Sequence, residues 1–214
     1  MSTRLASLRF VGFALLAGLA ASAPALAAPA GVPVPNPSLS SVDPVLVGTP
    51  SGTPVLCAGT TGPGFNIVVR DFVGTPIPGA VVTLGFLDAT GPRAFAMQSA
   101  GTTVNCVGRT ISKVSDPAGR AVFAARFGGF TNAADVEVSA DGVVIARVPA
   151  RSPDVLGTGN RADLPDLAAF AAAYQCASCP EFDFDNSGGA IGLNDLAIFS
   201  REYLLMPPGV PYCW

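Results

Sequence analysis

The sequence predicts a mainly β protein, in which an antiparallel two-sheet β-sandwich precedes a small all-α module. The 214 residues include 24 Gly and 20 Pro, and only 13% are charged. This composition is typical of short strands joined by tight turns. Apolar side chains alternate with polar ones through residues 43–150, whereas residues 151–206 contain one loop-helix motif written twice. We therefore expect two modules that differ in secondary structure.

The N-terminal residues have the pattern of a secretory signal peptide. Arg4 and Arg9 precede an apolar run over residues 10–20, and the small residues that follow end in Ala25-Leu26-Ala27. The alternative is a membrane anchor, for which the run is too short. We expect residues 1–27 to be removed, which leaves a secreted or cell-surface protein without a membrane span.

Residues 28–42 are rich in Pro, Ser, Ala and Gly. Such a composition buries too little apolar surface to order itself, so it predicts a flexible leader.

The strands of the sandwich are predicted by side chains that alternate between two faces. The apolar faces comprise Phe65, Ile67 and Val69; Val82, Leu84 and Phe86; and Ala121, Phe123, Ala125 and Phe127. Residues 107–114 are a further candidate strand. Asp141-Gly142 lies between the apolar runs 136–139 and 143–148, which predicts a β-hairpin with a tight turn.

Three motifs in this region resemble a known family. They are Asp71-x(7)-Pro78-Gly79-Ala80-x-Val82, Ser115-Asp116-Pro117-Ala118-Gly119-x-Ala121-x-Phe123 and Val136-x-Val138-x-x-Asp141-Gly142. Together they resemble a bacterial immunoglobulin-like domain of the invasin/adhesin type. The resemblance implies an immunoglobulin-like antiparallel β-sandwich over residues 43–150, and such domains serve as spacers, adhesins or accessory modules.

The sequence offers no catalytic motif. Histidine is absent, and no Ser, Cys or Lys lies in a recognisable nucleophile motif. The acidic residues of the sandwich are expected to form turns; they are Asp71, Asp88, Asp116, Asp135 and Asp141. The net charge of −3, without a basic cluster, argues against nucleic-acid binding. We therefore predict a protein that is not an enzyme.

The duplicated motif aligns residues 154–170 with residues 183–199 without a gap, at a constant offset of 29 residues. Each copy contains an acidic loop with Gly, followed by a short amphipathic helix. The helices place apolar side chains on one face, at i, i+3 and i+7. These are Leu167, Phe170 and Tyr174 in the first copy, and Leu196, Phe199 and Tyr203 in the second. Two such helices packed face to face form a small core.

The second loop has the residues of a Ca²⁺ site. Such a loop brings hard oxygen ligands together around a tight turn, and an acid closes the shell. The candidate ligands are Asp183, Asp185, Ser187 and Asp195, with one residue more than a twelve-residue loop before the closing acid. The first copy retains only Asp154 and Asp166, which predicts a weak or vestigial site. The alternative is that both loops are solvated turns without metal.

The repeat resembles a dockerin type I module, an EF-hand-like fold, over residues 151–206, with residues 207–214 as a C-terminal tail. The resemblance implies Ca²⁺ binding and attachment to a cohesin-like domain or another surface protein. The implied partner contacts are Leu164, Pro165, Leu193 and Asn194. We thus expect a secreted, non-catalytic protein for attachment or extracellular assembly, with a link to polysaccharide-degrading complexes. The alternatives are a carbohydrate-active or carbohydrate-binding accessory protein with a scaffold tag, and a cell-surface adhesin with a sorting or retention tail.

Five cysteines are candidates for disulfides in an exported chain, and they are Cys57, Cys106, Cys176, Cys179 and Cys213. Because Cys57 and Cys106 both lie within the sandwich, we expect them to pair. Two of the remaining three would then form a clasp, expected to join the linker or first helix to the C-terminus. At Cys176-x-x-Cys179 a structural bridge is favoured over a redox motif, which has no βαβ context, and over a zinc site, which has no second cysteine pair and no His to complete it.

Overall fold

The computed structural model describes residues 32–44, 54–59, 64–157, 161–205 and 210–214. Pro33–Trp214 form one unit, and the other unit, Met1–Val32, lies outside the described residues except for Val32. The expected signal peptide, residues 1–27, therefore lies outside the described residues. Among those that are described, no helix is both long and apolar enough to cross a membrane.

The largest sheet has six strands in the order β2-β11-β10-β4-β7-β6. Their bounds are β2 Leu56–Cys57, β4 Val81–Gly85, β6 Thr102–Asn105, β7 Thr110–Val114, β10 Thr131–Ala140 and β11 Val143–Arg151. All neighbours are antiparallel except β2 and β11, which run parallel. The predicted hairpin is confirmed between β10 and β11. Its turn residues Asp141 and Gly142 have φ of 46° and 80°, as a type I′ turn requires.

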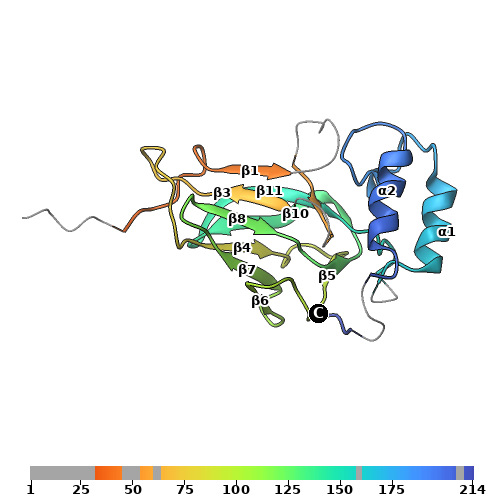
Figure 1. Cartoon of the computed structure of the whole chain (residues 1–214), viewed down its shortest axis with the longest axis horizontal. Coiled ribbons are helices and arrows are strands. Elements are labelled where there is room, and N and C mark those ends of the chain that lie inside the picture. The colour runs from red at the N-terminus through yellow and green to blue at the C-terminus, as the bar shows by residue number, and fades with distance from the viewer. Residues whose placement is uncertain (1–31, 45–53, 60–63, 158–160, 206–209) are drawn as a thin grey trace, which may run out of the picture. The chain divides into compact units, whose positions relative to one another are not determined.

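A second sheet has the order β1-β3-β8, and two short strands, β5 and β9, pair separately. The bounds are β1 Ser41–Pro44, β3 Phe65–Val68, β5 Arg93–Ala94, β8 Arg120–Phe123 and β9 Phe127–Gly128. The side chains predicted to face the core, from Phe65 to Phe127, are buried. They belong to one apolar cluster with residues from both larger sheets, which therefore pack face to face (Figure 1). The prediction of a mainly β chain is thus confirmed.

The expected flexible leader is in part a component of the fold. The backbone N–H of Asn36 donates to the carbonyl of Arg70 at 2.8 Å, and the N–H of Arg70 donates to the hydroxyl of Ser40 at 3.0 Å. Ser41 and Val42 belong to β1, which pairs with β3. Composition did not predict this docking, because edge pairing uses backbone groups that every residue carries.

The acidic residues of the sandwich have structural partners. Asp71, Asp116 and Asp141 each accept hydrogen bonds from backbone N–H groups. Asp88 instead forms an exposed ion pair with Arg147 at 2.8 Å. Asp135 lies within β10 and not in a turn, and its Oδ2 accepts from the hydroxyl of Thr131 at 2.9 Å. The turn prediction is therefore wrong for Asp135.

The duplicated segment forms two α-helices, α1 Leu164–Ala173 and α2 Leu193–Glu202, with a short 3-10 helix, η1, at Pro180–Phe182 between them. Phe170 and Phe199 occupy equivalent positions and stack with ring centroids 5.3 Å apart. The predicted face-to-face packing is therefore confirmed. The apolar cluster around these helices also includes Cys57 and Phe130, from the β-rich part of the chain. The helices consequently complete their core against the sheets.

The two copies also exchange backbone hydrogen bonds. Gln175, just after α1, donates to the carbonyl of Ile191 at 3.0 Å, and Leu204, just after α2, donates to the carbonyl of Ala162 at 3.0 Å. Both pairs are related by the 29-residue offset, and both donors have positive φ, 68° and 57°. Each helix end is therefore tied to the loop of the other copy, which gives the repeat an approximate twofold symmetry.

The disulfides differ from those expected. Cys106 pairs with Cys213, and Cys176 pairs with Cys179, while Cys57 is a free thiol. The predicted Cys57–Cys106 bridge is wrong, because β2 carries Cys57 to the core around the helices. Two of Cys176, Cys179 and Cys213 do pair, as expected, in the bridge between Cys176 and Cys179. The predicted clasp to the C-terminus is wrong, because Cys213 is joined to the segment between β6 and β7 and not to the linker. Disulfides are typical of oxidising compartments outside the cytoplasm.

Candidate metal centre

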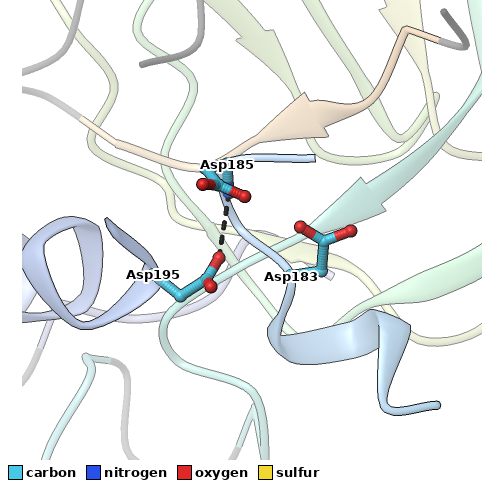
Figure 2. Close-up of side chains that lie close together, drawn as sticks. All are labelled: Asp183, Asp185 and Asp195. Carbon is cyan, nitrogen blue, oxygen red and sulfur yellow. Dashed lines mark hydrogen bonds between the residues drawn. The ribbon is translucent and has the colours of Figure 1, made fainter. Parts of the chain in front are cut away.

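The second loop of the repeat brings three carboxylates together (Figure 2). Asp183 follows η1, Asp185 lies two residues further, and Asp195 lies in the first turn of α2. A carboxylate oxygen from each lies within 4.8 Å of those from the other two, and all three residues are buried. No other group of three or more acidic, His or Cys ligands has this spacing in the part of the chain that the structure describes.

Backbone hydrogen bonds orient these carboxylates. Asp195 accepts from the N–H of Asp185 at 3.1 Å with Oδ1, and from the N–H of Gly192 at 3.0 Å with Oδ2. The N–H of Ser187 donates to Asp183 Oδ1 at 2.9 Å and to Asp185 Oδ1 at 3.0 Å. The loop therefore folds around its own carboxylates, and Ser187 contributes its backbone as well as its hydroxyl.

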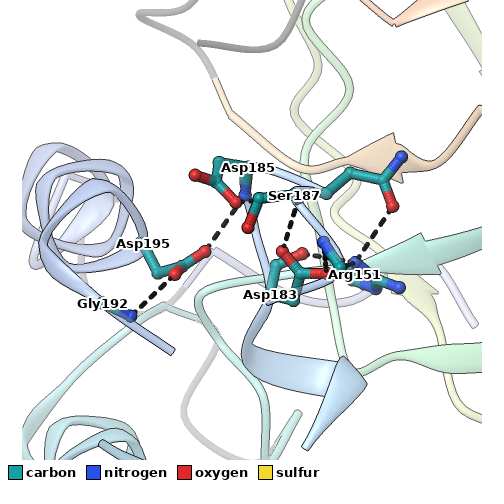
Figure 3. A network of polar contacts seen from close by, with 8 residues as sticks. Arg151, Asp183, Asp185, Ser187, Gly192 and Asp195 are labelled. Atoms are coloured by element: carbon teal, nitrogen blue, oxygen red, sulfur yellow. Dashed lines mark hydrogen bonds and ion pairs between the residues drawn. The ribbon is translucent and has the colours of Figure 1, made fainter. Parts of the chain in front are cut away.

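A buried arginine from the sandwich reaches this loop (Figure 3). Arg151, the last residue of β11, is only 7% exposed, and its Nη1 lies 3.3 Å from Asp183 Oδ2. The same nitrogen donates to the carbonyl oxygen of Asp183 and to Asn186 Oδ1. The sequence carried no signal for this contact, because Arg151 lies before the aligned residues of the first copy, 154–170, and outside either loop. One guanidinium beside three carboxylates leaves a surplus of negative charge.

The environment shifts the titration of these acids. Burial raises the pKa of Asp183 and of Asp195 above the ordinary value for Asp. Burial also acts to raise the pKa of Asp185, but hydrogen bonds with Ser187, Asp183 and Asn194 outweigh it, and the net shift is downward. Ionised carboxylates away from water need a compensating charge or hydrogen bonds. A bound cation would provide that charge.

The residues fit Ca²⁺ in chemistry. Ca²⁺ prefers carboxylate, carbonyl and water oxygens, and its affinity rises with the number of carboxylates in the loop. Asp183, Asp185 and Asp195 would supply the charged ligands, while backbone carbonyls and water would complete the shell. The positive φ of Asn186, 53°, and of Gly188, 72°, permits the tight turn that brings the carboxylates together.

The first loop repeats part of this arrangement. Asp166 accepts from the N–H of Leu156 at 3.0 Å with Oδ1, and from the N–H of Asp163 at 3.0 Å with Oδ2. These are the bonds of Asp195, displaced by 29 residues. Burial raises the pKa of Asp166 to about 6. The closing acid of each loop therefore holds the start of its helix and the loop backbone at once.

Asp154, the first acid of the first loop, has different partners. Its Oδ1 accepts from the N–H of Gly157 at 3.1 Å, and its Oδ2 accepts from the hydroxyl of Tyr212. Burial raises the pKa of Asp154. Leu156 stands where the second loop has Asp185, so this position offers no side-chain oxygen. Tyr212 lies beyond the repeat, and no sequence pattern related it to Asp154.

The residues predicted to contact a partner lie on the surface. Leu164 and Leu193 are the first residues of α1 and α2, and their exposed fractions are 67% and 72%. Pro165 and Asn194, the next residue in each helix, are exposed as well. Each helix therefore begins with a large apolar side chain that the repeat itself leaves uncovered.

Comparisons of this chain with family models, with curated proteins and with solved structures find no match.

Proposed function

We propose that this chain is a secreted, non-catalytic modular protein for attachment or extracellular assembly. It pairs an immunoglobulin-like domain, residues 43–150, with a Ca²⁺-binding dockerin-like tail, residues 151–206, and its setting includes polysaccharide-degrading complexes. The observation that carries the proposal is the cluster of Asp183, Asp185 and Asp195 inside a duplicated loop-helix fold. The two disulfides support export to an oxidising compartment.

The role of Ca²⁺ in this proposal is structural. Asp183 and Asp185 precede the turn that leads into α2, and Asp195 lies in the first turn of that helix. A cation shared by the three carboxylates would therefore hold the end of η1, the loop and the start of α2 together. Extracellular Ca²⁺ modules bind in the range of 10⁻⁴ to 10⁻³ M, and sensors bind more tightly. Arg151 reduces the surplus negative charge near Asp183 and so favours affinity toward the weaker end of this range.

Calcium is expected to stabilise the full chain. At a free concentration about 100-fold above the dissociation constant, the gain is about 2.7 kcal/mol, and for a chain of this size the melting temperature rises by roughly 5–10 °C. Asp185→Asn is expected to abolish this rise, because it removes a ligand charge from the centre of the cluster. Thermal melts in Ca²⁺ and in EDTA, with isothermal titration calorimetry, measure both effects.

Asp88→Asn is the matched control, since Asp88 is an exposed acid in a surface ion pair. It should retain the full calcium response. Identical melting temperatures of the wild-type chain in Ca²⁺ and EDTA, together with no heat of binding, would contradict the proposed metal site.

Attachment is proposed to use the apolar pair at the helix starts. Burial of a Leu side chain in an interface contributes about 1.5–3 kcal/mol, so Leu164 and Leu193 would together contribute about 3–6 kcal/mol to attachment. The 29-residue symmetry places them at equivalent sites on the two helices. The proposed partner is a cohesin-like domain with an apolar surface.

Replacing Leu164 and Leu193 together by Ser is expected to weaken partner binding at least a hundredfold, since each of the two losses corresponds to more than about 1.4 kcal/mol, or tenfold. The melting temperature should stay nearly constant, because exposed substitutions change stability by less than about 0.5 kcal/mol. Surface plasmon resonance against immobilised cohesin domains in Ca²⁺ measures the effect. Leu205→Ser, at another exposed leucine of the tail, is the control. Failure of the wild-type chain to bind any cohesin domain would exclude this class of partner.

A further inference from the structure

The last five residues, Val210–Trp214, form a segment that we name the C-terminal strap. Its backbone is hydrogen-bonded to the end of β5 and to the residues just after it. The N–H of Cys213 donates to the carbonyl of Ala94 at 2.7 Å, and the N–H of Ala96 donates to the carbonyl of Pro211 at 3.1 Å. The strap is also covalently held by the disulfide from Cys213 to Cys106. It therefore docks beside β5 through one isolated antiparallel bridge, between Phe95 and Tyr212.

Aromatic side chains seat the strap. The ring of Tyr212 stacks on Phe95 with centroids 4.9 Å apart. The indole of Trp214 lies 5.5 Å from the ring of Phe86 and 5.7 Å from the guanidinium carbon of Arg109. Its Nε1 donates to the carbonyl of Pro92 at 3.2 Å. These contacts give the strap one position on the sandwich.

In that position the Tyr212 hydroxyl donates to Oδ2 of Asp154, the first acid of the first loop. Gly128 of β9 adjoins this bond, and a Cβ there would collide with both the hydroxyl and the carboxylate. A glycine at this position therefore leaves the space that the Tyr212–Asp154 hydrogen bond occupies. In the second loop the equivalent acid, Asp183, has Arg151 as its partner.

We propose that the C-terminal strap closes the first loop of the repeat in place of a metal ion. A buried carboxylate needs a partner, and the Tyr212 hydroxyl supplies it to Asp154. The disulfide and the aromatic contacts fix the position of that hydroxyl, so little conformational entropy is lost when its hydrogen bond to Asp154 forms. Because Leu156 replaces the second acid, the strap leaves the first loop metal-independent and restricts cation binding to the second loop.

Hydrogen exchange of the full, oxidised chain in EDTA tests the strap. The N–H of Gly157 donates to Asp154 Oδ1, and the N–H of Gly129 donates to the Asp154 carbonyl at 2.6 Å. Tyr212→Phe removes one hydroxyl. Exchange at both amides is then expected to be about tenfold faster, because the loop loses one hydrogen bond to a charged group. Exchange at Ser187 and Gly188 in the second loop should be unchanged.

Tyr174→Phe is the matched control, because this tyrosine packs on Phe170 and is 40% exposed. Equal exchange rates in the two variants would overturn the proposal. A wild-type stoichiometry of two Ca²⁺ per chain in calorimetry would overturn it as well, and that measurement does not depend on how the variants fold. Since exchange is measured in EDTA, its outcome is separate from that of the calcium site.

Discussion

Replacing Cys106 and Cys213 together by serine is expected to lower the free energy of unfolding by about 4–5 kcal/mol. The disulfide joins residues 107 positions apart, and in the chain-entropy model a bridge that closes so long a loop restricts the unfolded chain strongly. Most single domains are stable by only 5–15 kcal/mol, so this loss is a large fraction of the total. Urea denaturation with linear extrapolation measures it.

The second disulfide is the natural control for this experiment. Cys176 and Cys179 are three positions apart, and the same model predicts about 2 kcal/mol for so short a loop. The double serine variant at this pair should therefore unfold at a clearly higher urea concentration than the Cys106/Cys213 variant. Equal losses in the two variants would show that the long bridge does not restrict the unfolded chain as proposed.

Phe170→Ala is expected to destabilise the chain by about 3–5 kcal/mol, the range for a large aromatic side chain removed from a packed core. Phe170 is buried at the centre of the helical cluster. Its ring lies 5.3 Å from that of Phe199 and 6.1 Å from those of Phe182 and Phe184. The cavity would therefore remove contacts from both copies of the repeat at once.

Phe72→Ala provides the comparison, because Phe72 is 67% exposed at a turn and its truncation should change stability by less than about 0.5 kcal/mol. Both variants are measured by chemical denaturation in EDTA, so that metal binding does not contribute. A loss below 1 kcal/mol for Phe170→Ala would mean that the stacked rings contribute little to the folded state.

Features that depend only on residues close together along the chain were predictable from the sequence. The alternation through Val82, Leu84 and Phe86 identified a buried strand face, because successive side chains point to opposite sides of a strand. Asp141-Gly142 identified the hairpin, because these residues tolerate positive φ. The periodic apolar residues of the repeat identified α1 and α2, because residues three and four apart lie on the same face of a helix.

The candidate site was predictable in part. Spacing within one loop singled out Asp183, Asp185 and Asp195, and the structure brings these three carboxylates together. Their binding of Ca²⁺ stays a prediction. Arg151 contacts Asp183, and Tyr212 contacts Asp154. The sequence predicted neither contact, since each side chain reaches its acid from a segment outside the loop.

The local elements follow from the sequence alone: the strand faces, the hairpin turn, the two helices and the acidic loop. Each follows from backbone preferences and side-chain periodicity over a few residues. The tertiary structure decided the partners of the cysteines, the docking of residues 36–42 and the seating of the C-terminal strap. These depend on which distant segments meet in space, and a cysteine or a tyrosine carries no local information about a partner that lies tens of residues away along the chain.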